Sequence, residues 1–483
     1  MPERLAIKDV ELFMRNVRTR MPFKYGVATL TSVPILHLKL TAELADGTAA
    51  VGYAADILPP KWFDKDPDKE YEQNVADLLL MARSAATAYG EAAATPRSVF
   101  DIWRDGYRAT LEIGDASKLN HLTASHGSSL MERALIDALG VARDQSYHSL
   151  LTTNALGIDF AALHTELAAM EPRDIIASRP LEAIAIRHTV GLGDPIHATD
   201  VAPENRLDDG LPQALEEYAR TQRLTYFKVK VSGEIDADLE RLREVAGMLA
   251  TVCGDDYWIT LDGNEQFKEM ESFEALVNSI RSDDGLQRFF ERIVYIEQPL
   301  DRSIALNEDV ESGVRAVAKH KPMLVDESDG DLDSFEMALQ RGYTGVSTKN
   351  CKGLIKALTN LALAKLHTEK SGVAHFLSAE DLMNLPVVPV HQDLTHIAAL
   401  GIGHAERNGH HYVRGLDHLS ASERAACARV HGSLYGKLDS TLAMKITEGS
   451  IDVTSLQVPG LGLGMPTDTS SMIPLHEWSF ESL

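Results

Sequence analysis

The segment TYFKVKV at residues 225–231 begins a series of short apolar runs that each finish in charged or polar residues. The runs that follow it are YWITLDG (257–263), RIVYIEQ (292–298), KPMLVDE (321–327) and YTGVSTK (343–349). Helical stretches separate these runs, and a step of about 30 residues is the size of a βαβ unit. Strand, helix and strand repeated in this order predict parallel strands joined by right-handed crossovers.

The same alternation extends on both sides of this series. The run LEAIAIRHTV precedes it at residues 181–190, and GVAHFLS follows it at residues 372–378. Eight strand–helix units need roughly 250 residues, which is the usual size of a TIM-type barrel. An open doubly wound sheet is the competing arrangement, but the nucleotide fingerprint that it often carries is absent after the first strand. We therefore predict an α/β fold built on a TIM-type barrel.

The residues before the barrel follow a different pattern. Residues from about 5 to 55 alternate as strands with a turn at Ala45-Asp46-Gly47, and residues from about 66 to 150 are helical in pattern. Strands followed by helices indicate an α+β unit. We expect an α+β domain at residues 1–175, the barrel at 176–414, and a C-terminal segment at 415–483 that packs back on both.

The composition limits the partners of this protein. Its 483 residues hold 47 Lys and Arg against 71 Asp and Glu, a formal net charge of −24. Nucleic acids and anionic membranes attract basic surfaces, so we expect neither as a partner. The N-terminal MPERLAIKDVELF is charged where a secretory signal is apolar, and no stretch reaches the ~20 apolar residues of a membrane span. Three widely separated cysteines form no disulfide framework, so we expect a cytoplasmic protein.

Three acidic residues, Asp262, Glu297 and Asp326, end successive predicted strands. Active sites of TIM-type barrels lie at the carboxyl ends of the strands, so these side chains are expected to converge. Without a cation they would repel one another, and all-oxygen ligation suits Mg²⁺, with Mn²⁺ as an alternative, better than zinc. The competing interpretation is that each acid caps the helix that follows it. Asn264 would hold a water on the metal or orient a ligand, unless it is a simple turn residue.

Lysines form the second group at the strand ends. Lys228 and Lys230 alternate within one run, so both amines point to one side while Phe227 and Val229 face the helices. Two neighbouring ammonium groups and a metal would lower a lysine pKa from about 10.4 toward working pH and suit it to general base catalysis. Lys349 would be a third inward lysine across the barrel. Lysines in water, on an edge strand or in a surface loop, are the alternative.

The order and spacing of these elements resemble the enolase superfamily, in its muconate lactonizing enzyme-like and dipeptide epimerase-like branch (the mandelate racemase/muconate lactonizing enzyme family). FKVKV is similar to the Lys-x-Lys element of that family, LDGN to its third-strand Asp-x-Asn, IEQP to its fourth-strand Glu, VDES to its fifth-strand Asp-Glu-Ser, and STKNCKG to its sixth-strand lysine. The resemblance implies a modified (β/α)7β barrel with an α+β N-terminal capping domain that the C-terminal segment completes. It further implies a last strand at HAERN with Glu406, and a homo-oligomer.

The resemblance also implies roles for individual residues. Asp262, Glu297 and Asp326 would bind Mg²⁺. Lys230 would act as an acid/base and Lys349 as its partner on the opposite face, with Lys228 as electrostatic support. Asn264 and Glu327 would support the ligands or a lysine. A lysine would remove the proton alpha to a substrate carboxylate, giving a metal-stabilised enediolate. Return of the proton by the opposite lysine makes a racemase or epimerase, which is the preferred hypothesis. A lyase (an acid-sugar dehydratase or cycloisomerase) is the alternative, and a non-catalytic relative is the third.

Loops of the capping domain choose the substrate in this family, so the resemblance directs attention to several further residues. The candidates for contact with a small-molecule carboxylate substrate are Phe23, Lys24 and Tyr25 in MPFKYG, Lys61 and Trp62 in PPKWF, and Glu380 and Asp381 after the seventh run. Ordinary packing is the alternative for the aromatic residues. Residues 57–126 and the segment around 197–212 are longer than the family pattern suggests. His410 and His411 lack the partners of a zinc motif, so we expect a surface or loop role for them.

Overall fold

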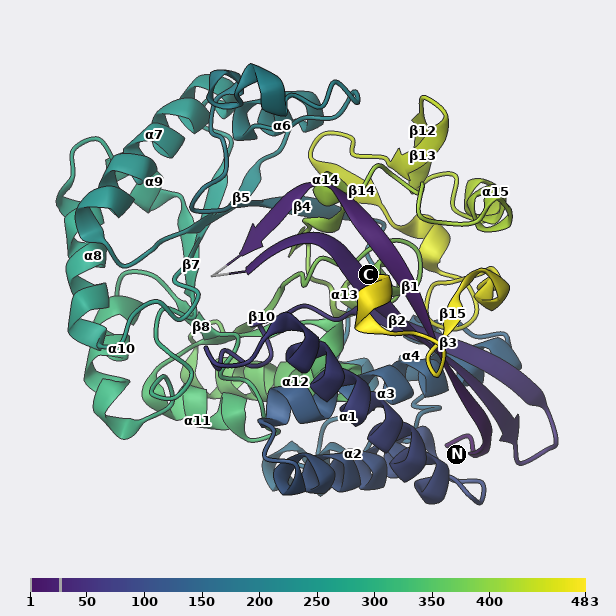
Figure 1. Ribbon diagram of the computed structural model, residues 1–483. Coiled ribbons are helices and arrows are strands. Elements are labelled where there is room, and N and C mark those ends of the chain that lie inside the picture. The colour runs from purple at the N-terminus through teal and green to yellow at the C-terminus, as the bar shows by residue number, and fades with distance from the viewer. Residues whose placement is uncertain (1, 26–27) are drawn as a thin grey trace.

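The centre of the molecule is a barrel that closes on itself. The structure, a computed structural model, describes residues 2–25 and 28–483. Figure 1 shows a row of helices along the outside of the barrel strands. Eight strands run parallel in sequence order, and the last pairs with the first at His404 and Ala185. The strands are β4 (Ala183–Val190), β5 (Tyr226–Lys230), β6 (Trp258–Asp262), β7 (Ile293–Glu297), β8 (Met323–Val325), β9 (Gly345–Thr348), β10 (Phe376–Ala379) and β11 (His404–Glu406).

Helices connect each strand to the next. They are α6 (Leu215–Gln222), α7 (Ile235–Cys253), α8 (Met270–Ser282) with α9 (Gln287–Glu291), α10 (Glu311–Ala318), α11 (Ser334–Arg341), α12 (Leu354–Ser371) and α13 (Val388–Leu400). Seven crossovers between eight strands confirm the predicted (β/α)7β barrel, including its last strand at HAERN. The predicted alternation is also confirmed, since Phe227 and Val229 are fully buried in the apolar core while Lys228 reaches the acidic groups of the barrel.

An antiparallel sheet and three helices form the N-terminal unit. The sheet holds β1 (Leu5–Tyr25), β2 (Ala28–Leu44) and β3 (Ala49–Ile57), and the helices are α1 (Tyr71–Ala92), α2 (Val99–Ala116) and α3 (His121–Arg143). The predicted turn lies between β2 and β3, where Gly47 has a φ of +88° that suits glycine. Gly52 of β3 lies against α3 so closely that an added Cβ would meet the carbonyl oxygen of Ala134.

The C-terminal segment returns to this unit. The short strand β15 (Ile473–Pro474) pairs with β1 at Phe13 and Met14, beside β1 in Figure 1. Arg15 of β1 and Glu423 form a buried ion pair of 2.9 Å. The C-terminal segment therefore completes the capping domain, as predicted. The residue boundaries of the three parts stay a prediction.

Shorter elements complete the fold. The short helices and strands are α4 (Tyr147–Thr152), α5 (Pro172–Ile175), α14 (Gly409–Tyr412), α15 (Ala421–Val430), β12 (Tyr435–Leu438), β13 (Thr441–Met444) and β14 (Ser450–Asp452), which pairs antiparallel with β4. The 3-10 turns are η1 (Phe160–Ala162), η2 (Thr165–Leu167), η3 (Ala198–Asp200), η4 (Pro203–Asn205), η5 (Glu308–Val310), η6 (Asn350–Lys352), η7 (Thr454–Leu456), η8 (Thr469–Ser471) and η9 (Phe480–Ser482).

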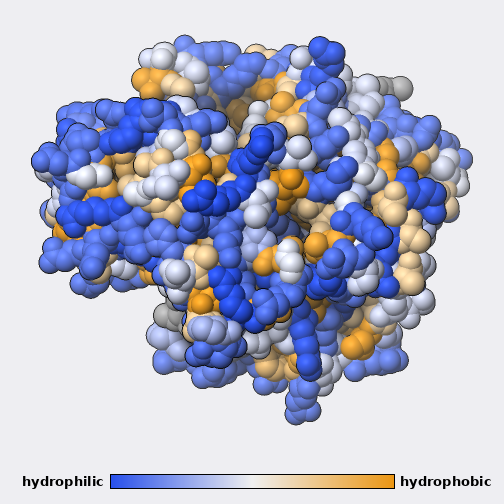
Figure 2. All heavy atoms as spheres, turned by 90° about the horizontal axis from the view of Figure 1, so that it is seen from above, coloured by the Kyte–Doolittle hydropathy of each residue, from blue (hydrophilic) through white to orange (hydrophobic). Residues whose placement is uncertain are grey.

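The surface agrees with the acidic, polar composition. The face in Figure 2 is mostly hydrophilic, with apolar residues in small separate patches. Among the described residues, no helix has the length and apolar character needed to cross a bilayer.

The contact between α1 and α3 gives a first prediction. A Cβ added to Gly127 of α3 would lie 2.2 Å from the carbonyl oxygen of Met81 on α1, so Gly127→Ala must push the two helices apart. Overpacking of this kind costs about 1–3 kcal/mol of unfolding free energy. Gly90 of α1 has open space around it, so Gly90→Ala is the matched control and is expected to gain about 0.5–1 kcal/mol. Urea unfolding of both variants checks this, and equal stability of the two would contradict the packing.

Candidate active site

The predicted site residues meet at the carboxyl ends of the strands. Lys228 and Lys230 lie on β5, Asp262 ends β6, Glu297 ends β7, and Asp326 and Lys349 directly follow β8 and β9. One cavity of about 660 Å³, part of it open to solvent, is lined by Lys228, Lys230, Asp262, Asn264, Asp326 and Lys349 together with Glu406 of β11. The convergence predicted from the strand ends is therefore present in the structure, with Glu297 buried behind the cavity wall.

Lys228 is the centre of this cluster. Its Nζ donates hydrogen bonds to Glu297 Oε1 at 2.8 Å, Glu380 Oε2 at 2.8 Å and Glu406 Oε2 at 3.2 Å. Asp262 Oδ2 is a fourth carboxylate oxygen at 3.2 Å. Burial lowers the pKa of Lys228, but the four carboxylates outweigh burial and hold this pKa well above its ordinary value. The lowering of the pKa expected from a neighbouring lysine and a metal is therefore absent from this arrangement, because Asp262 and Glu297, followed by Glu380 and Glu406, all act on Lys228 in the opposite direction.

Lys349 faces the cluster from the other side. Its Nζ donates to Asp326 Oδ2 at 2.5 Å and lies 4.5 Å from the centre of the Trp62 ring, a cation–π contact. Burial lowers the pKa of Lys349, but Asp326 outweighs burial and raises it above the ordinary value. Lys349 is therefore an ammonium in this arrangement. The ring of Trp62 contacts this ammonium, so ordinary packing is not its whole role.

Lys230 is held differently from the other two lysines. Its Nζ donates to Asn264 Oδ1 at 3.2 Å, and the nearest Asp262 oxygen is 3.9 Å away. Asn264 in turn donates through Nδ2 to Glu327 Oε1 at 3.0 Å and through its backbone N–H to Asp262 Oδ1 at 2.7 Å. Burial and the neighbouring Asp326 raise the pKa of Glu327 to about 7. Asn264 thus connects a lysine, a candidate metal ligand and Glu327, and its role in orienting a ligand stays a prediction.

The charges of the barrel fit a hard cation. Glu297 Oε2 is buried without a hydrogen-bond partner, and the pKa of Glu297 lies well above its ordinary value because of burial and of Glu380, Asp262 and Asp326 around it. An all-oxygen donor set suits Mg²⁺. The candidate ligands are nevertheless turned toward lysines. Among the described residues, only His164, Glu166 and Glu336, outside the barrel, bring three such ligand atoms within 4.8 Å of one another.

The substrate-contact candidates divide into several groups. Phe23, Lys24, Trp62 and Asp381 line the cavity. Glu380 is wholly buried beneath Lys228, paired with Arg187, and does not line the cavity, so its prediction as a substrate contact is wrong in this structure. Lys61 turns its Nζ to the carbonyl oxygens of Asp66 and Lys69 instead. The side chain of Tyr25 lies outside the described residues.

The two histidines of NGHHY are not both at the surface. His411 is buried, and its Nε2 lies 2.8 Å from His188 Nδ1.

A barrel residue holds the Trp62 loop in place. Arg302, shortly after β7, donates to the carbonyl oxygens of Trp62 at 2.8 Å and Phe63 at 2.9 Å, and it forms an ion pair of 2.7 Å with Glu265. Sequence patterns gave no sign of this contact, which joins residues 240 positions apart.

A second cavity adjoins the first. The two share Lys24, Thr189, Asp194, Asn408 and Tyr412 in their walls, and the second continues along residues 193–215. This region includes the long segment after the first barrel strand. The inserted segment around residues 197–212 therefore borders the second cavity, which adjoins the cavity of the predicted catalytic groups.

Sequence reasoning missed Lys352. Its Nζ donates to the Asp326 carbonyl oxygen at 2.5 Å and to Ser347 Oγ at 2.7 Å, and it lies 3.1 Å from Asp326 Oδ1. Lys352 therefore holds Asp326 in position, and Asp326 is the residue that Lys349 contacts. The available signal was the second lysine of STKNCKG, three residues after Lys349.

This contact gives a second prediction. Lys352→Met leaves Asp326 and Asp329 buried with one cation fewer, so we expect a loss of about 3–5 kcal/mol of unfolding free energy. Lys319 is exposed and forms no ion pair with a described residue, so Lys319→Met is expected to change stability by less than about 0.5 kcal/mol. Chemical denaturation measures both variants, and a Lys352→Met protein as stable as the control would rule out the buried pair.

The fold and these strand-end groups define a capped (β/α)7β barrel with acids and lysines at its mouth. Solved proteins of the same fold include a muconate lactonizing enzyme from Pseudomonas fluorescens complexed with muconolactone, which is 17% identical over 96% of this chain and 98% of its own, with a TM-score of 0.59. A dipeptide epimerase from Enterococcus faecalis complexed with Mg and the dipeptide L-Leu-L-Tyr is 14% identical over 95% and 99%, with a TM-score of 0.58.

An enolase from Bradyrhizobium complexed with magnesium and mandelic acid is likewise 14% identical over 97% of this chain and 98% of its own, with a TM-score of 0.58. No protein-family profile matches the chain, and no curated protein matches it. The resemblance to the mandelate racemase/muconate lactonizing enzyme branch of the enolase superfamily is confirmed as a likeness of fold over nearly the whole chain.

Proposed function

We propose that this protein is an Mg²⁺-dependent enzyme of the enolase superfamily that removes the proton alpha to a substrate carboxylate and returns it on the other face, as a racemase or epimerase. One observation carries the proposal. Lys230 and Lys349 line the same cavity from β5 and from the end of β9, and the three strands that carry the candidate metal ligands lie between theirs in the barrel. Two proton carriers on opposite sides of one carbon are what inversion requires.

The candidate ligands for the metal are Asp262, Glu297 and Asp326. The unpartnered Glu297 Oε2 and the mutual repulsion of the acids support a cation at this position. When bound, Mg²⁺ supplies Lewis-acid stabilisation of the charge that develops on the substrate carboxylate.

Lys230 is suited to take the proton. Its hydrogen bond to the Asn264 amide oxygen orients Nζ toward the cavity, and no carboxylate of the described residues accepts a hydrogen bond from it. Lys349 is suited to return the proton, since Asp326 and the Trp62 ring hold it as an ammonium. The two lysines exchange these roles for the opposite stereoisomer. Lys228 is enclosed by four carboxylates, so it holds the candidate ligands in place and exchanges no proton.

The second cavity supports a substrate that extends beyond its carboxylate and the alpha carbon at which the proton is exchanged. A small carboxylate with a side group that extends past Lys24 and Tyr412 fits the joined cavities. The insert around residues 197–212 would then take part in the choice of substrate.

The lysines give the third prediction. Candidate acid sugars, dipeptides and amino-acid derivatives are incubated with the protein and Mg²⁺ in D₂O, and exchange at the alpha carbon is followed by NMR. On an accepted substrate, Lys230→Ala and Lys349→Ala should each lower inversion by about 10²- to 10⁴-fold, because each removes one proton carrier. Each variant should still exchange the alpha proton of one stereoisomer, and the two variants should prefer opposite ones. Lys319→Met is the control and should retain full turnover.

The outcome of this experiment separates the candidate functions. Full activity in either lysine variant would end the two-lysine assignment. An unsaturated or cyclised product, in place of the inverted substrate with deuterium, would identify a lyase instead.

The metal ligands give the fourth prediction. Mg²⁺ that binds the folded state raises its unfolding temperature. Asp262→Asn removes an anionic ligand, so the rise on addition of Mg²⁺ should shrink or disappear. Asp284→Asn, at an exposed carboxylate, is the control and should keep the wild-type response. A scanning fluorimetry titration of the three proteins tests this, and an unchanged response in Asp262→Asn would exclude the ion from that site.

A further inference from the structure

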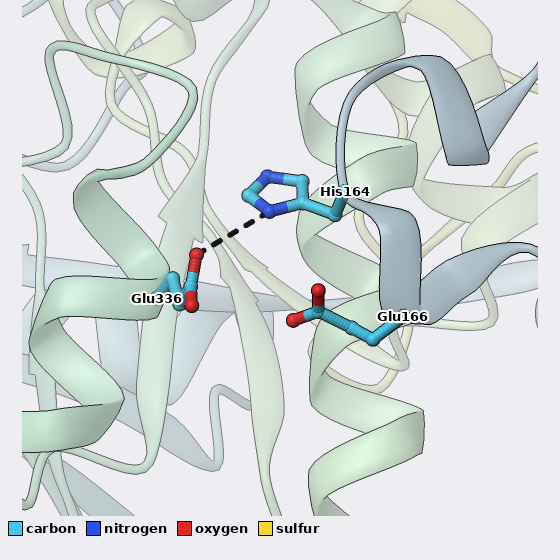
Figure 3. A group of neighbouring side chains, drawn as sticks. All are labelled: His164, Glu166 and Glu336. Carbon is cyan, nitrogen blue, oxygen red and sulfur yellow. Dashed lines mark ion pairs between the residues drawn. The ribbon is translucent and has the colours of Figure 1, made fainter.

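A second group of ligand-type side chains lies on the outside of the barrel. His164 precedes η2, Glu166 lies within it, and Glu336 belongs to α11 (Figure 3). One ligand atom from each lies within 4.8 Å of the other two. In Figure 3 the imidazole and both carboxylates point into the same space between the two elements. The group therefore joins the segment between the cap and the barrel to a helix of the barrel.

His164 is unusual for a buried histidine. Its exposed fraction is 5%, yet its Nε2 is buried without a hydrogen-bond partner. Its Nδ1 lies 3.4 Å from Glu336 Oε2, and neither ring nitrogen forms a hydrogen bond with a described residue. Buried polar groups are usually hydrogen-bonded. The ring is instead held with Nδ1 directed at the two carboxylates (Figure 3).

The two carboxylates lack a cation of their own. Within residues 2–25 and 28–483, neither Glu166 nor Glu336 forms an ion pair with a lysine or arginine. The surface pair of His197 and Glu216 provides the contrast, because Arg220 lies 3.1 Å from Glu216 and neutralises it. Two carboxylates face a single imidazole, and among the described residues neither is paired with a lysine or arginine, so the group carries surplus negative charge.

The three side chains combine two kinds of donor atom. His164 offers an imidazole nitrogen, and Glu166 and Glu336 offer carboxylate oxygens. Imidazole nitrogen combined with carboxylate oxygen is a donor set for zinc and neighbouring first-row metals, whereas Mg²⁺ prefers oxygen alone.

We propose that His164, Glu166 and Glu336 bind a divalent first-row transition ion of the Zn²⁺ class, with water as a further ligand. The ion ties η2 to α11. This site is distinct from the barrel mouth in its residues and in its donor chemistry. Its role is to fasten the segment between the cap and the barrel, because it bridges elements more than 150 residues apart in the sequence.

The test uses the full-length chain freed of metals by a chelator and then supplied with excess Mg²⁺, so that an all-oxygen site is already filled. Isothermal titration with ZnCl₂ should show one Zn²⁺ site. His164→Ala and Glu336→Gln should each weaken binding by about 10- to 100-fold or more. His197→Ala, at the histidine whose carboxylate already has an arginine, should bind Zn²⁺ as the wild type does.

Thermal unfolding gives a readout that does not depend on any activity. Zn²⁺ should raise the unfolding temperature of the wild type and of His197→Ala, and it should leave that of His164→Ala and Glu336→Gln unchanged. Glu336→Gln keeps the shape of the side chain and guards against a fold lost through His164→Ala. Absence of Zn²⁺ binding by the wild type would overturn the proposal. So would equal binding by Glu336→Gln, or a Zn²⁺ signal that disappears in Asp262→Asn instead.

Discussion

The ammonium of Lys228 and the four carboxylates around it hold the mouth of the barrel together. The acids come from β6, from β7, from the residue after β10 and from β11, so this single cation joins opposite walls of the barrel. Charges buried this deeply are tolerated only when they are paired and hydrogen-bonded. Removal of the lysine would leave four buried acids that repel one another without the cation that joins them.

The surroundings of this cluster divide the lysines into two kinds. Lys228 is saturated by carboxylates and is a fixed charge, whereas Lys230 contacts an amide oxygen and faces the cavity. Lys349 lies between these extremes, with one carboxylate and one aromatic face. Arg302 fixes that face by holding the Trp62 backbone, so a loop of the capping domain sets the environment of a barrel lysine. The capping domain thereby contributes to the environment of Lys349 and does more than cover the barrel mouth.

Much of this arrangement was predictable from the sequence, because a parallel barrel places each strand end at the same mouth. The strands from residue 181 to residue 378 and the inward phase of Lys228 and Lys230 follow from local periodicity, whereas the closing strand at HAERN was expected only from the family resemblance. Contacts across the barrel are what local periodicity cannot predict. Glu380 looked available to a substrate until its pairing with Arg187, 193 residues earlier, showed it to be buried. The expected fall in the pKa of Lys228 is absent for a similar reason. The net effect of its neighbours on this pKa depends on acids that only the closed barrel brings near.

The balance of charge inside each cluster also separates structural ion pairs from sites that need a ligand. The His197 and Glu216 pair has Arg220 beside it and is complete within the chain. Among the described residues, Glu297 retains a buried oxygen without a hydrogen-bond partner although Lys228 occupies the other one. His164 retains ring nitrogens without hydrogen bonds beside two acids that no lysine or arginine pairs with. A folded chain seldom leaves buried polar atoms unsatisfied. Where it does so next to carboxylates, a cation from solution is the completion that we propose, and the donor atoms would then select its type: oxygen alone for the barrel, nitrogen with oxygen for the outer site.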